Sequence, residues 1–467
     1  MEKDRYSFGR GLPRIAEHVL STSEDGRYVL DTVQKGDGGE YELYLSGPTG
    51  RWERLARYED KAVAGEFGPD GMLYVLSRDE APRGKILRVD PRARSLARAE
   101  VIVPEGDAAL EELLVTASKL YVVELVGGPQ QLRVYDHDGK NGRLVPTLPI
   151  SDVGKPIPLA GDAVLFANTS FIEPTAWWSW QPGDAAPTKT ALVTRSLATF
   201  DDTEIRRVSV ASRDGTMVPL TIILKKGTRL DGKNPTLLTG YGGYGLSLGP
   251  SFSPFRRVWL DLGGVFAIAN LRGGGEFGEA WHRAGNLTRK QNVFDDFAAC
   301  AKWLIANRYT RSARLAIMGG SNGGLLMGAM ITQHPDLFGA VVSRVGIYDM
   351  LRVELQPNGE FNTTEFGSTR DPEQFRALYA YSPYHRVVDG TAYPAILFST
   401  GKHDPRVDPS HSRKMTARLQ ASGTRRRVLL RTSGDTGHGM GTSLSRRIDE
   451  DADIVAFLVS ELGLRSP

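Results

Sequence analysis

The pattern of apolar and polar positions changes once along the chain, at about residue 200. Before that point, short apolar runs are separated by turn residues, and a turn followed by an apolar strand recurs at residues 23–30, 68–76, 116–123 and 160–166. Corresponding positions of these units, Tyr28, Tyr74, Tyr121 and Leu165, lie 46, 47 and 44 residues apart. Such a unit and period are typical of four-stranded β-propeller blades. We therefore predict a partial β-propeller domain of about four blades over residues 1–200, with unrelated β-hairpins as the alternative.

From about residue 201, apolar segments of strand length alternate with helical patterns. The expected strands cover residues 236–239, 265–270, 315–318, 340–345, 395–400 and 428–432. The clearest helical patterns cover residues 292–307, 324–333, 410–422 and 448–462. Strands that alternate with helices indicate a mostly parallel, doubly wound sheet with helices on both faces. Residues 201–467 are therefore predicted to form a second domain of the α/β class.

The sharpest local motif is Gly319-Gly320-Ser321-Asn322-Gly323, which follows an apolar strand and precedes a helical pattern. Gly-x-Ser-x-Gly between a strand and a helix is the nucleophile elbow of α/β-hydrolases. The turn holds its serine in a strained conformation, and the flanking glycines avoid clashes across it. The start of the following helix favours the negative charge that develops at the hydroxyl. Ser321 is the predicted nucleophile of an α/β-hydrolase catalytic domain.

A serine nucleophile needs a histidine that takes its proton. In this fold the order along the chain is serine, acid, histidine. His438 lies in a glycine-rich loop between the last expected strand and the last helix, which is where this fold carries its histidine. The other histidines after Ser321 lie at a helix end, in the loop of the candidate acid or near prolines: His334, His385, His403 and His411. His438 is the predicted base.

The histidine in turn needs an acid that orients it. Asp404 follows the expected strand at residues 395–400, as the acid of this fold does, and Asp408 is its close rival. Asp349 and Asp389 come earlier and are expected to lie on the surface or to cap helices. Asp404 is the predicted third member of the triad.

Composition narrows the remaining classes of function. The formal net charge is +3 and the basic residues are spread along the chain, which argues against a nucleic-acid partner. The chain has one cysteine, Cys300, which we expect to be a buried structural thiol. No His-Glu-x-x-His, cysteine pair or carboxylate loop indicates a metal, and no phosphate loop indicates a nucleotide, so no cofactor is expected. No apolar run reaches membrane-spanning length, so we expect a soluble, cytoplasmic chain without a membrane partner.

Six motifs, taken in order, resemble the prolyl oligopeptidase family of serine peptidases. They lie at residues 239–244, 270–278, 291–297, 319–324, 404–407 and 437–439. The resemblance covers nearly the whole chain and is strongest from residue 214 onward. It implies a serine peptidase that acts on short peptides, with a β-propeller joined to an α/β-hydrolase domain.

The resemblance also implies roles for individual residues. Tyr241 matches the tyrosine whose hydroxyl forms the oxyanion hole with the backbone N–H of Asn322, and Arg406 matches the arginine that holds a substrate carbonyl. A further set matches the positions that line the pocket for the residue before the cleaved bond: Tyr244, Ile347, Asn362, Phe366 and Val407. Arg272 and Glu276, in the glycine-rich stretch, are interpreted as a buried ion pair that supports the site.

Two features depart from the family pattern. Asn362 stands where proline-specific members carry a tryptophan that stacks on the proline ring, so strict proline preference is not implied. The family's propeller has seven blades, whereas this chain is expected to begin inside the propeller.

The predicted function is hydrolysis of short peptides through an acyl-enzyme on Ser321, with cleavage after proline as one candidate preference. An acylaminoacyl-peptidase or an esterase is the alternative enzyme, because the same triad hydrolyses amides and esters. A non-catalytic binding protein built on the propeller is the alternative of another class. The choice between monomer and homo-oligomer stays open.

Overall fold

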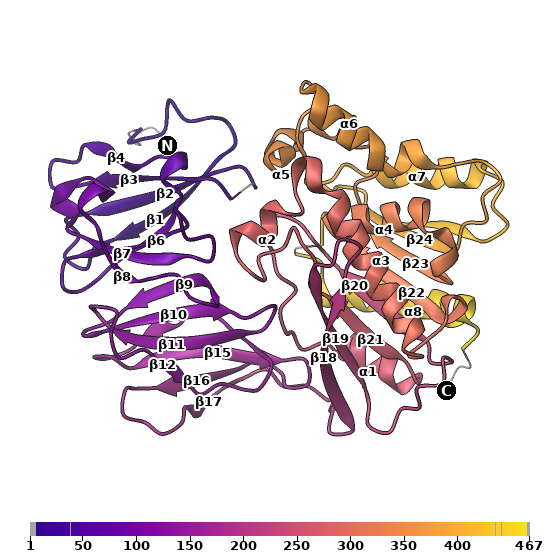
Figure 1. Cartoon of the computed structure of the whole chain (residues 1–467), viewed down its shortest axis with the longest axis horizontal. Helices are drawn as coiled ribbons and strands as arrows, with labels where there is room; N and C mark the ends of the chain where they lie inside the picture. The colour runs from indigo at the N-terminus through magenta and orange to yellow at the C-terminus, as the bar shows by residue number, and fades with distance from the viewer. Residues whose placement is uncertain (1–5, 38, 435, 440, 465–467) are drawn as a thin grey trace. The chain divides into compact units, whose positions relative to one another are not determined.

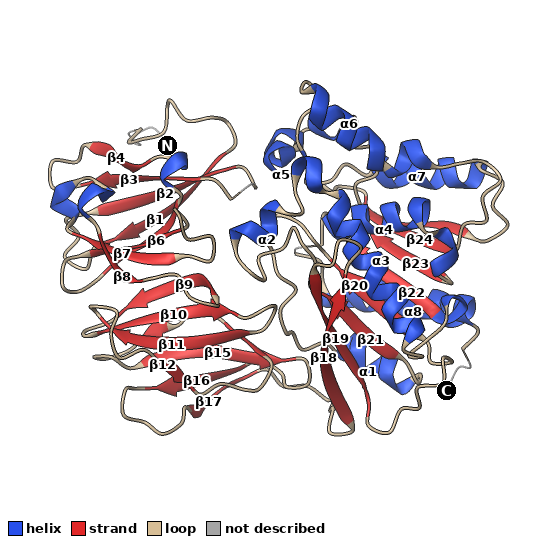
Figure 2. Cartoon of the chain, in the orientation of Figure 1, coloured by secondary structure: helices blue, strands red, loops and turns tan. Residues whose placement is uncertain are grey.

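The computed structural model describes residues 6–37, 39–434, 436–439 and 441–464 of the chain. The chain divides into two compact units. The first runs through residue 169 and takes in residues 175–193 and 277–279; the second holds residues 170–174, 194–276 and 280 onward. In Figure 2 the chain up to β17 is drawn mostly as strands and loops, whereas helices gather around β18 to β25.

The first unit consists of four antiparallel sheets that follow one another along the chain (Figure 1). The first sheet contains β1 (Ala16–Thr22), β2 (Val29–Lys35), β3 (Tyr41–Ser46) and β4 (Trp52–Ala56). The second contains β5 (Ala62–Phe67), β6 (Leu73–Ser77), β7 (Lys85–Val89) and β8 (Glu100–Val103). The third contains β9 (Ala109–Val115), β10 (Lys119–Leu125), β11 (Gln130–Asp136) and β12 (Arg143–Val145). The fourth contains β13 (Ser151–Val153), β14 (Ile157–Pro158), β15 (Val164–Ser170), β16 (Ala176–Trp180) and β17 (Thr188–Val193).

Successive sheets share apolar cores, as propeller blades do. Leu30 and Leu43 of the first sheet pack with Leu73 of the second, and the second and third sheets form a similar shared cluster. The repeating sequence unit corresponds to the second strand in the path of each sheet, where Tyr74 and Tyr121 are fully buried. The prediction of propeller blades, about four in number, in the first part of the chain is confirmed.

The second unit is built on one eight-stranded sheet of order β18-β19-β21-β20-β22-β23-β24-β25. β18 and β19 are antiparallel to each other, and β19 is antiparallel to β21; every later pairing is parallel. The strands are β18 (Thr203–Ala211), β19 (Met217–Lys225), β20 (Thr236–Gly240), β21 (Val265–Ala269), β22 (Leu315–Gly320), β23 (Ala340–Arg344), β24 (Ala395–Gly401) and β25 (Val428–Ser433). This sheet confirms the predicted α/β-hydrolase class.

Helices alternate with these strands. They are α1 (Pro254–Asp261), α2 (Glu279–Arg283), α3 (Gln291–Ala306), α4 (Asn322–Gln333), α5 (Thr363–Phe366), α6 (Pro372–Tyr381), α7 (Ser410–Ala421) and α8 (Leu444–Leu462). Side chains from α3, α4 and α7 join strand residues in one apolar core, which includes Cys300 of α3. Burial raises the pKa of the Cys300 thiol far above its usual range. None of the helices in the described ranges is long and apolar enough to cross a bilayer.

Candidate active site

Ser321 lies in the turn between the last residue of β22 and the first residue of α4, and its backbone has an unusual conformation. Its φ is +58° and its ψ is −120°, a left-handed conformation that side chains rarely adopt. A Cβ at Gly319 would lie 2.4 Å from the carbonyl oxygen of Gly323, so Gly319 does not tolerate a side chain without a backbone shift, and a Cβ at Gly323 would lie only 3.0 Å from the carbonyl oxygen of Gly240. The glycines on either side therefore allow β22 and α4 to meet at this angle. As a result, the hydroxyl stands at the start of the helix.

The structure brings the three predicted triad residues together. The Nε2 of His438 lies 3.1 Å from the Oγ of Ser321, and its Nδ1 lies 2.7 Å from Oδ2 of Asp404. The side chain of Asp404 is fully buried and that of His438 is 14% exposed. The other carboxylate oxygen of Asp404 accepts 2.9 Å hydrogen bonds from the backbone N–H groups of Arg406 and Val407. The acid is thus held on both oxygens, and the ring is aimed at the serine.

Other candidate acids and bases are engaged elsewhere. Asp408 accepts a hydrogen bond from the backbone N–H of Ser410 at the start of α7, and Asp349 pairs with Lys414 and Arg352. His411, on α7, accepts hydrogen bonds at Nδ1 from the backbone N–H groups of Tyr348 and Asp349. Burial lowers the pKa of His411 to about 4, so this ring is neutral in the fold. His411 and Lys414 of α7 thus hold the loop after β23, and Asp408 lies at the start of α7.

The loop that follows β20 packs against the elbow. The side-chain amide of Asn322 donates a 2.7 Å hydrogen bond to the carbonyl oxygen of Tyr241, and a Cβ at Gly323 would lie 3.6 Å from Cδ2 of the Tyr241 ring. Asn322 is the first residue of α4, so its backbone N–H has no partner within the helix. Tyr241 and Asn322 are therefore in contact beside the nucleophile.

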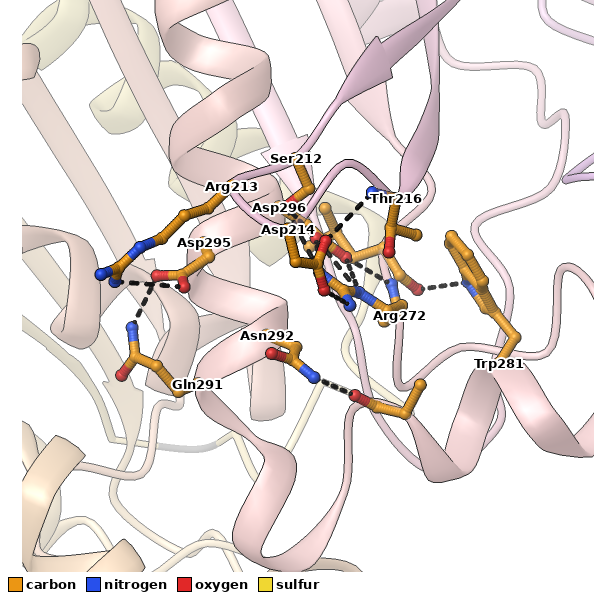
Figure 3. Close-up of polar contacts among 12 residues, drawn as sticks. Ser212, Arg213, Asp214, Thr216, Arg272, Trp281, Gln291, Asn292, Asp295 and Asp296 are labelled. Carbon is orange, nitrogen blue, oxygen red and sulfur yellow. Dashed lines mark hydrogen bonds and ion pairs between the residues drawn. The ribbon is translucent and has the colours of Figure 1, made fainter.

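A buried arginine anchors the glycine-rich stretch that runs along this loop. Figure 3 shows the Arg272 guanidinium between Asp296 of α3 and Asp214; its Nε lies 2.9 Å from Oδ2 of Asp296, and its NH1 bonds Asp214. Arg272 lowers the pKa of Asp214 well below its usual range. The predicted Arg272–Glu276 ion pair is wrong, because Asp296 and Asp214 take the guanidinium. Glu276 accepts a hydrogen bond from Asn270 at 3.0 Å instead.

The predicted pocket residues form one group in the same unit. Ile347, Phe366 and Val407 are buried in the apolar core, and Tyr244 packs on that core with its ring 5.7 Å from that of Phe366 in an edge-to-face arrangement. The Tyr244 hydroxyl donates a 2.7 Å hydrogen bond to the side-chain oxygen of Asn362. The Tyr244–Asn362 hydrogen bond thus joins two residues beside the buried ring of Phe366. Arg406 is exposed, two residues after Asp404.

Lys290, which no motif in the sequence marks, is buried next to Phe366. Its side chain is 1% exposed and its Nζ lies 2.7 Å from Oε1 of Glu365, the residue before Phe366. The second oxygen of Glu365 lies 2.8 Å from Nε2 of His282. A lysine between a short turn and a helix resembles any surface cation in sequence, so only the fold reveals that it is buried.

A cavity of 440 Å³ opens on Ser321 and His438. Its wall also carries polar side chains from the ends of β23, β24 and β25, among them Arg344 and Arg431, and Glu450 of α8. Within the described part of the chain, no group of three His, Cys, Asp or Glu side chains could hold a metal ion.

Two family models match the chain. One, described as the prolyl oligopeptidase N-terminal beta-propeller domain, matches residues 2–191, and the other, the prolyl oligopeptidase family, matches residues 250–465. The chain is 31% identical over 455 residues to a prolyl endopeptidase of Elizabethkingia meningoseptica and 35% identical over 471 residues to one of Dictyostelium discoideum. Each alignment covers 95% of this chain, which spans 63% and 60% of those relatives' lengths.

A solved structure from a structural and mechanistic study of two prolyl endopeptidases has the same fold. It matches with a TM-score of 0.93 and 36% identity, and the alignment covers 99% of this chain and 69% of that chain.

Proposed function

Since the chain belongs to the prolyl oligopeptidase family, we propose that it is a serine peptidase that hydrolyses short peptides through an acyl-enzyme on Ser321. The observation that carries this proposal is the unbroken contact from Asp404 through His438 to Ser321, at the elbow between β22 and α4. The relatives that bear the name prolyl endopeptidase support the same class of activity.

The geometry suits acyl transfer. With Nδ1 protonated and donating to Asp404, the Nε2 of His438 accepts the proton of Ser321 as the hydroxyl oxygen attacks the scissile carbonyl. The carbonyl oxygen becomes an oxyanion, which the Tyr241 hydroxyl and the Asn322 backbone N–H receive. His438 then gives its proton to the leaving amine, and water enters by the reverse path to release the acid. Asp404 keeps the tautomer and stabilises the imidazolium.

The pocket residues support a preference for a small or cyclic apolar residue, proline included, before the scissile bond. Phe366, Ile347 and Val407 supply the apolar base, and Tyr244 and Asn362 supply a hydrogen-bonded rim. Asn362 lacks the flat aromatic face that would favour proline strongly, so residues such as alanine are accepted as well. Arg406, exposed beside the triad, holds a peptide carbonyl upstream of that residue.

A fluorophosphonate probe and a peptide panel test the proposal. The purified chain should be labelled at Ser321, and Ser321→Ala should abolish labelling. Peptides of the form Z-Gly-X-aminocoumarin, with X as proline, alanine, leucine, lysine or aspartate, should be cleaved best when X is proline or alanine. Labelling without cleavage of any peptide, but with cleavage of p-nitrophenyl esters, would identify an esterase instead.

A further inference from the structure

Lys290 is a buried cation that touches two parts of the candidate active site at once. Its ammonium donates a 2.9 Å hydrogen bond to the carbonyl oxygen of Gly242 and a 2.7 Å bond to Oε1 of Glu365, and it lies 5.3 Å from the centre of the Phe366 ring. Glu365 is fully buried. These three contacts therefore belong to the loop after β20 and to α5.

The first contact fixes the loop that carries the oxyanion tyrosine. Gly242 directly follows Tyr241, and its φ of +64° makes the peptide unit here a sharp turn. A Cβ at Gly242 would lie 2.3 Å from Cγ1 of Val293, so the turn is pressed against α3. The Lys290 bond holds the carbonyl oxygen of this turn, one peptide unit from the Tyr241 side chain. Because Gly242 is bonded directly to Tyr241, a shift of Gly242 is expected to shift Tyr241 as well.

The second contact fixes the pocket wall. Glu365 and Phe366 are consecutive residues at the end of α5, and Asn362, just before α5, accepts the hydrogen bond from Tyr244. Tyr244 belongs to the same loop as Gly242. The loop and α5 are thus joined twice, once by the Tyr244–Asn362 hydrogen bond and once by Lys290, which bonds both Gly242 and Glu365. Burial raises the pKa of Glu365, but Lys290 and His282 outweigh this effect and bring it below the usual value.

Fold stability alone gives little reason for a lysine at this point. A buried ion pair loses much of its attraction to desolvation, and apolar replacements of similar volume are often as stable. What the pair adds is a fixed geometry, because an ammonium must satisfy its donors with particular oxygens. Here those oxygens are the carbonyl next to Tyr241 and the carboxylate next to Phe366.

We propose that Lys290 is a positioning residue that sets the Tyr241 hydroxyl against the oxyanion and aligns the pocket wall with it. This inference rests on the proposed peptidase function. Lys290 itself touches no reacting atom; it acts through Tyr241, and its removal should therefore lower kcat more than it raises KM.

A double-mutant cycle tests this role. With Z-Gly-Pro-aminocoumarin or the best substrate of the panel, Lys290→Met should lower kcat about 100-fold, because small displacements of catalytic groups cost this much. Tyr241→Phe should lower kcat by about 10² to 10³ by removal of one oxyanion donor. In the Tyr241→Phe background, Lys290→Met should cost less than about fivefold, since the hydroxyl that Lys290 positions is already gone.

Arg256→Met is the matched control. Arg256 is also a buried cation that donates to backbone carbonyl oxygens, those of Phe171 and Ser251, and it lies over the ring of Phe266; none of these three residues belongs to the candidate site. Its loss should change kcat less than about threefold, because its contacts lie outside the candidate site. The change should be the same in both backgrounds, because mutations at distant sites are additive. Independent, multiplicative losses for Lys290→Met and Tyr241→Phe would overturn the inference.

A second variant covers the case in which Lys290→Met does not fold. Glu365→Gln keeps the shape and an acceptor for the ammonium but removes the charge, so it should give a smaller loss of kcat that again disappears in the Tyr241→Phe background. A loss that persists there would also overturn the inference. Absence of Ser321-dependent cleavage in the wild type would instead contradict the proposed function itself.

Discussion

The elbow and the proposed pocket wall are built in different ways. At the elbow the geometry is set by the backbone, because Ser321 has a positive φ and Gly319 has no room for a Cβ beside the Gly323 carbonyl. At the pocket wall the geometry is set by contacts between side chains. Tyr244, from the loop after β20, contacts Asn362 and Phe366 at either end of the short helix α5. We therefore expect the elbow to tolerate few substitutions and the pocket wall to tolerate more, so that catalysis and specificity can be changed separately.

The largest expected effect lies at the elbow. Ser321→Ala removes the nucleophile, and kcat/KM for the best peptide should fall by about 10⁶ while substrate affinity and the thermal midpoint stay close to the wild type. Steady-state kinetics, peptide binding measured by calorimetry and thermal unfolding check these three quantities. Retention of more than about one per cent of the activity would show that another group attacks the substrate.

Replacement of the two neighbouring acids, Asp404 and Asp408, should have very different effects on kcat. Asp404→Asn leaves the His438 ring without a carboxylate and should lower kcat by about 10⁴. Asp408→Asn is the control, because this residue accepts a backbone N–H at the start of α7 and has no contact with the ring. It should change kcat less than about twofold, with at most about 1 kcal/mol of stability lost. Equal losses for both variants would contradict the assignment of the acid.

The loop that carries Ile347 should make stability depend on pH. The pKa of His411 is lowered by burial from 6.5 to about 4, so the folded chain keeps this ring neutral at pH values where the unfolded chain protonates it. The unfolded state then binds more protons, and stability falls as pH drops from about 6.5 towards 4. The effect should reach about 3 kcal/mol at pH 4.

Denaturant unfolding between pH 7 and pH 4 measures this dependence. In His411→Gln the unfolding free energy should be lower at pH 7 but should fall less steeply with acid. If the unfolding free energies of the wild type and of His411→Gln fell in parallel with pH, His411 would not contribute to the pH dependence.

The smallest expected effect concerns specificity. Asn362→Trp supplies an aromatic face and should raise the ratio of kcat/KM for proline over alanine about fivefold, as expected for one ring contact. Asn362→Ala is its control, because it also removes the Tyr244 acceptor but adds no ring, and it should leave the ratio near the wild-type value. If both variants changed the ratio alike, loss of the hydrogen bond would be the cause.

Sequence alone predicts the parts of this chain that local physics constrains most. The six expected strands from residue 236 onward match β20 to β25 to within two residues, because each is a continuous apolar run bounded by turn or helix signals. The antiparallel β18 and β19 go unpredicted, although β19 is almost wholly buried. The polar residues along β18 hide the strand, which pairs along its whole length with β19.

The residues of the candidate site also fall into those that the sequence predicts and those that it does not. Ser321, Asp404 and His438 can be predicted because each has a distinctive place after a strand or in a glycine-rich loop, and the structure places them in contact. Long-range ionic partners cannot be predicted in this way. Arg272 pairs with residues 24 and 58 positions away, and Lys290 with one 75 positions away, so no local pattern connects them.

The buried thiol of α3 has a practical consequence. Because Cys300 is the one cysteine in the sequence and its side chain has no solvent exposure, alkylating reagents can reach it only when α3 separates from the sheet. The rate of its alkylation under native conditions therefore measures how often this part of the α/β unit opens. No engineered reporter is needed to ask whether a bound peptide slows that opening.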